Sequence, residues 1–502
     1  MRINNINSKL NFKGPLDGVF TTAMRTCDMN EMVNAVGLDV GAMVIPRAWY
    51  DTTHRNPDAG FETFFREISG TFINCLSAGI FAQLIAKFAN KHYMKDVNIN
   101  TNSWFSKDSM ETLNLAWNKT KNTKNYVANV LDNLQGIDGH KTTSFKNIDW
   151  QNIEWIDENK WNKYKWDNKA YQNFEEKLKT KEDVINSFTK IIKDENITKN
   201  DKNNALSILE ARLTNALKSE REVKLKIDNK EVSSKLEFII RDIYDMGKDI
   251  LNEKVKNPEQ ILKKIKNINK IKAFGAISLA SILGLSNQYI NRKLTEKRTG
   301  KKGFVGDLDF NDKNKTDKPK DKMFLAKKIL ASLAMVGMVL GVMKVKNFKD
   351  FARKLEFTGP ITSGNAIKTV YASVIVGRFM AADNGTELRE SMTRDYLGFL
   401  NWLVFGGFFS KGIANLLDKK GEKLFNYSKE GKGIKHWLND MTLKTHNEIA
   451  SKGKEFAKKN MWKINLAQAG GIAYSAITLG ILLPMMNAKI TEHKNKVINN
   501  KN

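Results

Sequence analysis

Cysteine and proline are both scarce in this chain of 502 residues, and each shortage excludes a class of protein. The 2 cysteines, Cys27 and Cys75, are too few for a disulfide framework. The 7 prolines, together with the lack of alternating β-branched runs, argue against a β-sandwich or β-barrel. Long stretches of Lys, Glu, Leu, Ile and Ala favour helix instead.

Motifs for catalysis and metal binding are also missing. The 6 histidines are scattered without the spacing of metal ligands such as HExxH, and no CxxC pair occurs. The chain has no GxSxG nucleophile motif and no plausible Cys–His pair. The sequence therefore favours a non-enzymatic protein without a cofactor or metal.

Positive charge is in large excess. The 82 basic and 55 acidic residues give a net charge of +27. Such an excess predicts an anionic partner, which could be lipid headgroups, nucleic acid or an acidic protein. Lys, Asn and Ile are also abundant, as an AT-rich coding sequence would make them, so charge alone does not select the partner. We favour anionic lipid headgroups over nucleic acid because of the hydrophobic runs described next.

Several hydrophobic runs approach the roughly 20 residues that a membrane span needs. Three of them carry no charge over that length: 68–86, 273–291 and 464–488. Two shorter uncharged runs are marginal: 329–343 and 396–410. Two further stretches are too short to span alone: 40–46 and 369–377. The pattern predicts an all-α, multi-pass membrane protein, and the alternative is a large soluble protein with fully buried central helices.

Glycines inside these runs are candidates for close helix packing, because small residues let helices approach each other in lipid. The candidates are Gly337, Gly341, Gly406, Gly407, Gly470 and Gly471. The N-terminal residues 1–11 are polar and lack the apolar run of roughly 7 to 15 residues that a signal peptide requires. We therefore expect a membrane protein without a cleavable signal peptide.

Comparison of the chain with itself predicts an internal duplication. Four landmarks recur in the same order, two of them over long stretches without a gap. The first two pairs are Phe12–Leu16 with Phe357–Ile361, and Ile45–Arg47 with Val376–Arg378. The third and fourth pairs are Glu62–Ala86 with Glu390–Ala414, and Gly275–Glu296 with Gly471–Glu492. The predicted fold is a duplicated helical membrane unit.

The duplication divides the chain into segments. These are a polar segment 1–11, the first part of the first half 12–90, a soluble helical insert 91–270, the last helix of the first half 271–297, a basic linker 298–356 that contains the run 329–343, the second half 357–493 and a basic tail 494–502. The insert contains six tryptophans, which we expect to form a small core. The alternatives are that these aromatic residues among lysines stack on nucleic-acid bases or anchor at a membrane surface. Its leucines 206, 209, 213 and 217 have helical spacing.

The direction of the two halves depends on the run 329–343. If each half contributes two spans and 329–343 is a fifth, the halves are inverted, as in many transporters. If 329–343 stays at the surface, the halves are parallel. The positive-inside rule does not decide, because the connections on both sides are basic.

The duplicated charged residues are the candidate site. They are Arg47, Glu62, Arg66 and Glu67 in the first half and Arg378, Glu390, Arg394 and Asp395 in the second. One interpretation makes them anchors at the membrane interface, stabilised by pairs four residues apart. The other pairs them between the halves near a pseudo-two-fold axis, where they gate or pin the assembly.

Two parts of the sequence resemble a family of bacterial hypothetical proteins. The first is the opening Asn4-Asn5-Ile6-Asn7 followed by Asn11-Phe12-Lys13-Gly14. The second comprises Phe64–Gly79 and Arg389–Leu403. The resemblance implies a bacterial origin but no activity, so no functional residue follows from it.

Taken together, the sequence predicts a multi-pass helical membrane protein that is transporter-like or a scaffold, and that could form homo-oligomers. The alternative is a soluble or peripheral basic protein that binds an anionic membrane surface or nucleic acid.

Overall fold

The structure is a computed structural model, and it is dominated by helix. It describes residues 15–29, 31–94, 105–139, 141–153, 155, 164–301, 305, 323–357, 363–427 and 431–499. Helix accounts for 76% and strand for 6%, which confirms the helical prediction. The segment 1–11 and the landmark Phe12–Leu16, except for its last two residues, lie outside the described residues.

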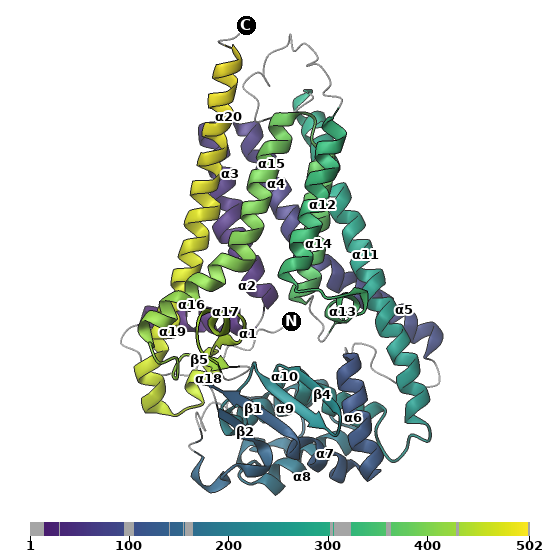
Figure 1. The fold of residues 1–502 in the computed structure, drawn as a ribbon. Coiled ribbons are helices and arrows are strands. Elements are labelled where there is room, and N and C mark those ends of the chain that lie inside the picture. The colour runs from purple at the N-terminus through teal and green to yellow at the C-terminus, as the bar shows by residue number, and fades with distance from the viewer. Residues whose placement is uncertain are drawn as a thin grey trace.

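Long helices form one body, which we call the helical unit (Figure 1). Its helices before the insert are α1 (Pro15–Met29), α2 (Glu31–Leu38), α3 (Ile45–His54), α4 (Pro57–Phe72) and α5 (Ala78–Tyr93). After the insert come α11 (Pro258–Thr299), α12 (Phe324–Val342), α13 (Phe348–Lys354), α14 (Gly364–Ala381), α15 (Gly385–Leu400), α16 (Gly406–Leu417), α19 (Lys454–Ser475) and α20 (Leu483–Asn499). The predicted boundary at residue 270 falls inside α11, which runs without a break from Pro258.

π-helical turns join several of these helices into longer ones. They are η1 (Asp39–Val44), η2 (Ile73–Ser77), η8 (Asn401–Phe405) and η9 (Ala476–Leu482). The turns η2 and η8 occupy matching positions in the third pair of landmarks. The helices that contain them also begin alike, because Asn56 accepts from the N–H of Ala59 and Asn384 accepts from the N–H of Glu387.

The two halves run in the same direction. In Figure 1, η1–α3 and α14 both rise from the end that carries the insert, which we call the lower end, and α4–α5 and α15–α16 both descend to it. Helix α11 and the pair α19–α20 rise again, and α12 descends between the halves. The short runs 40–46 and 369–377 therefore lie in helices that add a third pass to each half. The inverted arrangement expected with 329–343 as a fifth span assumed two passes and is wrong.

The insert forms a separate domain at the lower end, which we call the insert domain (residues 105–257). Its helices are α6 (Lys107–Thr120), α7 (Thr123–Asp132), α8 (Lys181–Lys193), α9 (Lys199–Leu217) and α10 (Leu236–Asp249). It also contains β1 (Leu134–Asp138), β2 (Lys141–Ser144), β3 (Val223–Ile227) and β4 (Lys230–Ser234), which pair antiparallel in the order β2-β1-β3-β4. The sequence predicted only helices in this segment, and this sheet corrects that prediction.

Aliphatic side chains make most of the insert domain's core. Leu209, Leu213 and Leu217 are fully buried on α9, as their spacing predicted. Of the tryptophans, Trp117 is buried in this core, whereas Trp150 and Trp166 pack at its edge. Trp104 and Trp161 lie outside the described residues.

A small subdomain, residues 418–453, docks onto the insert domain. It contains β5 (Phe425–Tyr427), α17 (Ile434–Asn439), β6 (Met441–Leu443) and α18 (His446–Ala450), with β5 and β6 antiparallel. The buried Glu448 carboxylate accepts from the backbone N–H groups of Glu220 at 2.7 Å and Arg221 at 3.0 Å. His446 lies 2.5 Å from Asp28 of α1, so the contact also reaches the helical unit.

We expect this contact to be sensitive to pH because of Glu220. Burial, with the nearby charges of Glu448 and Asp28, raises the pKa of the Glu220 carboxyl above its ordinary value. An acid whose pKa is raised by folding stabilises the folded state when protonated, and this contribution is lost as pH rises through the raised pKa. We expect Glu220→Gln to raise the thermal unfolding midpoint by a few degrees at about pH 8 and to change it little at about pH 5.

The exposed Glu176→Gln is the matched control in the same domain. It should shift the midpoint equally little at both pH values. A Glu220→Gln protein that loses stability at about pH 8 would contradict the assignment.

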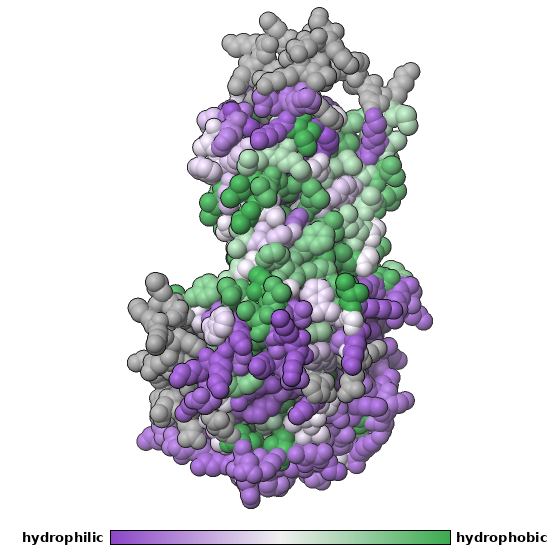
Figure 2. Space-filling model, turned by 60° about the vertical axis from the view of Figure 1, so that its left-hand side comes forward, coloured by the Kyte–Doolittle hydropathy of each residue, from purple (hydrophilic) through white to green (hydrophobic). Residues whose placement is uncertain are grey.

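The surfaces of the two main bodies differ in kind. Figure 2 shows an apolar band across the visible face of the helical unit, between a polar upper end and the polar insert domain. Large hydrophobic side chains are exposed on most of the long helices of the unit, for example Phe72, Ile282 and Leu330. In the described part of residues 94–270, no large hydrophobic side chain is exposed.

Candidate functional site

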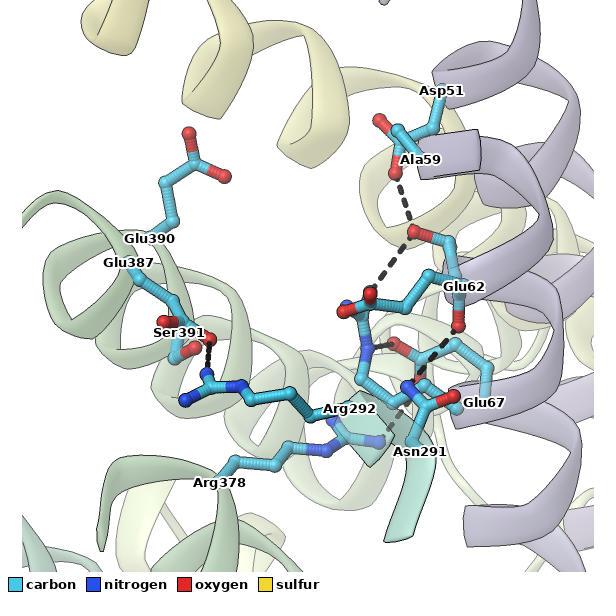
Figure 3. A network of polar contacts seen from close by, with 12 residues as sticks. Asp51, Ala59, Glu62, Glu67, Asn291, Arg292, Arg378, Glu387, Glu390 and Ser391 are labelled. Carbon is cyan, nitrogen blue, oxygen red and sulfur yellow. Dashed lines mark hydrogen bonds and ion pairs between the residues drawn. The ribbon is translucent and has the colours of Figure 1, made fainter. Parts of the chain in front are cut away.

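A cluster of buried charges lies between the two halves, inside the apolar helical unit. Arg378 of α14 and Asp395 of α15 are 4% and 1% exposed, and they form an ion pair at 2.9 Å. Arg378 also reaches Glu67 of α4 at 3.2 Å (Figure 3). One arginine of the second half thus binds a carboxylate from each half.

The first half contributes its own arginines to the same carboxylate. Arg47 of α3 lies 3.6 Å from Glu67, and its Nε donates to the backbone oxygen of Leu479 in η9 at 2.9 Å. Arg66 lies 3.4 Å from Glu67. Glu67 is therefore surrounded by arginines from both halves, with Arg394 at 4.0 Å.

The hydrogen bonds of the two halves repeat each other. Arg66 donates to the Thr63 hydroxyl at 3.1 Å, and Arg394 donates to the Ser391 hydroxyl at 3.3 Å. The Nε of Arg394 lies 3.2 Å from Asp395, as that of Arg66 lies near Glu67.

The last helix of each half supplies a matching asparagine. Asn291 of α11 donates to the backbone oxygen of Glu62 at 3.5 Å, and Asn487 of α20 donates to that of Glu390 at 3.1 Å. Residues that the predicted duplication pairs thus make matching contacts, and the duplication itself stays a prediction.

A second tie between the halves lies nearer the upper end. Arg55, which follows α3, contacts the Glu390 carboxylate at 3.1 Å and Asp51 at 3.3 Å. The hydroxyl of Thr491 also donates to Glu390. Glu390 was among the site residues predicted from the repeat. Arg55 and Asp51 were not, because neither has an equivalent residue in the second half. Thr491 was visible as part of the fourth pair of landmarks.

A pocket opens beside these charges. Its volume is about 480 Å³ when the space at its mouth is included. It is lined by Arg47, Asp51, Arg55, Ala59, Thr63, Arg66, Val305, Glu390, Arg394, Pro484 and Asn487. Of the predicted site residues, Arg47, Arg66, Glu390 and Arg394 line it, whereas Glu62, Glu67, Arg378 and Asp395 do not.

The six predicted packing glycines divide into two groups. A Cβ on Gly406 or Gly471 would meet the Ser475 or Ser410 hydroxyl, and one on Gly470 would meet Ile413, so these three lie at the contact between α16 and α19. Gly337, Gly341 and Gly407 have open space at that position, so the structure places no helix against them.

The closest approaches to the backbone of a neighbouring helix occur at two glycines outside the predicted set. A Cβ on Gly377 would lie 2.5 Å from the backbone oxygen of Leu285, and one on Gly480 would lie 2.4 Å from that of Ala42. The first joins α14 to α11 and the second joins η9 to η1. Each half therefore packs its first apolar helix against the last helix of the other half.

Within the described residues, no group of three or more His, Cys, Asp or Glu side chains could hold a metal ion. Cys27 and Cys75 are free thiols. The arrangement is suited to holding charges inside an apolar body and to joining two halves.

Comparison of the chain with protein-family models, curated proteins and solved structures finds no match. The resemblance to bacterial hypothetical proteins stays a prediction, and the function has to be argued from the geometry.

Proposed function

We propose that this protein is a multi-pass helical membrane protein, transporter-like, in which two parallel halves enclose a charged pocket. The observation that carries the proposal is the inverted polarity of the helical unit. A cluster of its charged side chains is buried between the halves, while many of its large hydrophobic side chains are exposed. Water would penalise such a surface, whereas lipid is its natural solvent. The insert domain has the opposite, ordinary polarity.

The lengths of the helices support this proposal. Four described helices or fused helices are long and apolar enough to cross a membrane: Pro57–Tyr93, Pro258–Thr299, Phe324–Val342 and Lys454–His493. The helix formed by α15, η8 and α16 carries the marginal run 396–410 and lies beside them.

A lysine borders each of the five uncharged runs at its lower end. These lysines are Lys87, Lys272, Lys344, Lys411 and Lys463. The residues that border the runs at the upper end are of both signs: Glu67, Arg292, Lys328, Asp395 and Lys489. Lysines beside apolar runs mark the cytoplasmic side and attract anionic headgroups. The longer connections are basic on both sides, but only the lower end has a lysine at the border of every run. On this difference we place the insert domain in the cytoplasm and the pocket toward the opposite face.

Two parallel halves around a polar site are an arrangement that transporters use, with the pseudo-two-fold axis along the membrane normal. A membrane scaffold would need no charged pocket between its halves, so the pocket favours the transporter-like function. The alternative, a soluble or peripheral protein that binds nucleic acid or an anionic surface, would leave the apolar band exposed to water.

Carbonate extraction of membranes, combined with labelling by a membrane-impermeant maleimide, tests the placement. We expect the full chain to stay with the membrane pellet. In intact cells, Asp383→Cys at the upper end should be labelled, and the matched Lys119→Cys of the insert domain should be labelled only after permeabilisation. Release into the supernatant would favour the soluble alternative, and labelling in the reverse pattern would overturn the orientation.

A further inference from the structure

The lining of the pocket between the halves is unequal in charge. Four of its side chains are arginines and two are carboxylates. The arginines come from both halves: Arg47, Arg55 and Arg66 from the first, and Arg394 from the second. Glu67 and Asp395 do not line the pocket, and they bind the Nε atoms of Arg66 and Arg394. The surface that faces the pocket therefore carries an excess of positive charge.

Arg47 is the residue of this lining that combines deep burial with an unpaired hydrogen-bond donor. The residue is only 5% exposed, and within the described part of the chain its Nη2 atom has no hydrogen-bond partner. Arginine stays charged at every physiological pH, and a buried donor without a partner destabilises the structure around it. Arg47 also lines the pocket, so an anion bound there would lie beside this guanidinium.

The pocket already holds one oxoanion, which is the side chain of Glu390. Its carboxylate binds Arg55 at 3.1 Å and accepts from the hydroxyl of Thr491. Arg55 belongs to the first half, whereas Glu390 and Thr491 belong to the second. The carboxylate thus shows which chemistry the pocket accepts, and it links the halves at the same time.

We propose that the pocket binds a small oxoanion of the phosphate, sulfate or carboxylate class through Arg47 and Arg55, in competition with the Glu390 carboxylate. This inference rests on the proposed function, because it names the class of ligand for the pocket between the two halves. An anion on Arg55 replaces an ion pair that joins the halves. Binding therefore breaks the ion pair between Arg55 and Glu390 at the upper end, while Arg378 still joins the two halves below it.

The planar guanidinium groups suit this ligand class. Arginine binds carboxylate and phosphate oxygens in a bidentate manner, and such hydrogen bonds gain strength away from water. A cation is disfavoured because the four arginines repel it. The anion could come from solution or be the phosphate of a lipid headgroup, since the pocket lies just beyond the upper ends of the apolar runs.

The test is a titration of the purified full chain in neutral detergent with inorganic phosphate and, separately, with sulfate, followed by calorimetry and by the thermal unfolding midpoint. We expect saturable binding. Glu390→Gln removes the competing charge and should tighten binding about tenfold, a usual size for coupling between two sites. Arg47→Gln should weaken it by a similar factor, and Arg47→Lys should restore part of the loss.

Matched controls come from an ion pair outside the pocket. Arg292 binds Glu387 at 2.5 Å, and Glu387 lies one turn before Glu390 on α15 (Figure 3). Arg292→Gln and Glu387→Gln should leave anion affinity unchanged. If Arg47→Gln fails to fold, the gain expected for Glu390→Gln still tests the proposal.

The outcomes separate the sources of the ligand. Saturable binding of inorganic phosphate supports a dissolved anion. A lipid phosphate is supported if binding occurs only with phosphatidylglycerol nanodiscs and is tighter for Glu390→Gln than for Glu387→Gln. No binding in either preparation, or equal effects of the Glu390 and Glu387 variants, would overturn the site. The titration uses purified protein, so failure of carbonate extraction would count against the membrane placement alone.

Discussion

Replacement of Arg378 by methionine should destabilise the helical unit more than any other single change in the charged cluster. Arg378 binds Glu67 of the first half and Asp395 of the second, and all three groups are less than a tenth exposed. Removal of one partner from a buried ion pair costs roughly 3–5 kcal/mol, because the other charge stays buried and uncompensated. We expect a large fall in the thermal unfolding midpoint in detergent, or a loss of monodisperse protein in size-exclusion chromatography.

Arg353→Met is the matched control. The side chain of Arg353 is 60% exposed, and it pairs with Asp108 and Asp350 at the surface. Exposed pairs contribute at most about 1 kcal/mol, so this variant should behave like the unmodified protein. Equal midpoints for the Arg378 and Arg353 variants would show that the buried pair does not hold the halves together.

A double-mutant cycle measures the coupling energy between residues of the two halves. Arg378→Met and Glu67→Gln should be non-additive by roughly 0.5–3 kcal/mol, since the two residues touch. Arg66 contacts Glu62, Glu67 and Thr63, which all belong to its own half. The cycle that reports on the two halves is therefore the one through Arg378.

The second large effect is expected at Gly377. A Cβ there would lie 2.5 Å from the backbone oxygen of Leu285, and backbone atoms cannot rotate out of the way as the end of a side chain can. Gly377→Ala should therefore push α14 away from α11, at a cost of roughly 1–3 kcal/mol. The measurement is again the unfolding midpoint of the full chain in detergent.

Gly341→Ala is the control for the same substitution in a helix of the same unit. No atom lies within 4 Å of the added Cβ, and alanine favours helix over glycine by about 1 kcal/mol. This variant should match or exceed the stability of the unmodified protein. If Gly341→Ala destabilised and Gly377→Ala did not, the close contact would lie at α12 rather than between α14 and α11.

The candidate site was partly predictable from the repeated residues. Glu67 and Arg378 could be selected because each recurs at a matching place in the other half. Their partners could not be assigned, because an ion pair depends on which helices face each other. Arg55 and Asp51 escaped selection because neither has a counterpart in the second half.

The sheet of the insert domain was missed for a different reason. Strand β2 (Lys141–Ser144) is short and partly or fully exposed, and β4 (Lys230–Ser234) buries only Val232 deeply. Such strands have no apolar run, and their pairing is stabilised by neighbours far away in the sequence. Helix α9, by contrast, was visible because its leucines are spaced by the helical period.

The sequence by itself determined the helical class, the apolar runs, the repeated charges and the excess of lysine, because each of these is a property of neighbouring residues or of composition. The tertiary structure decided that the halves are parallel, that each packs its first helix on the last helix of the other, and that arginines from both halves converge on Glu67. These features depend on contacts between residues hundreds of positions apart. Local propensity cannot specify such contacts, because their energy arises only when the helices have packed.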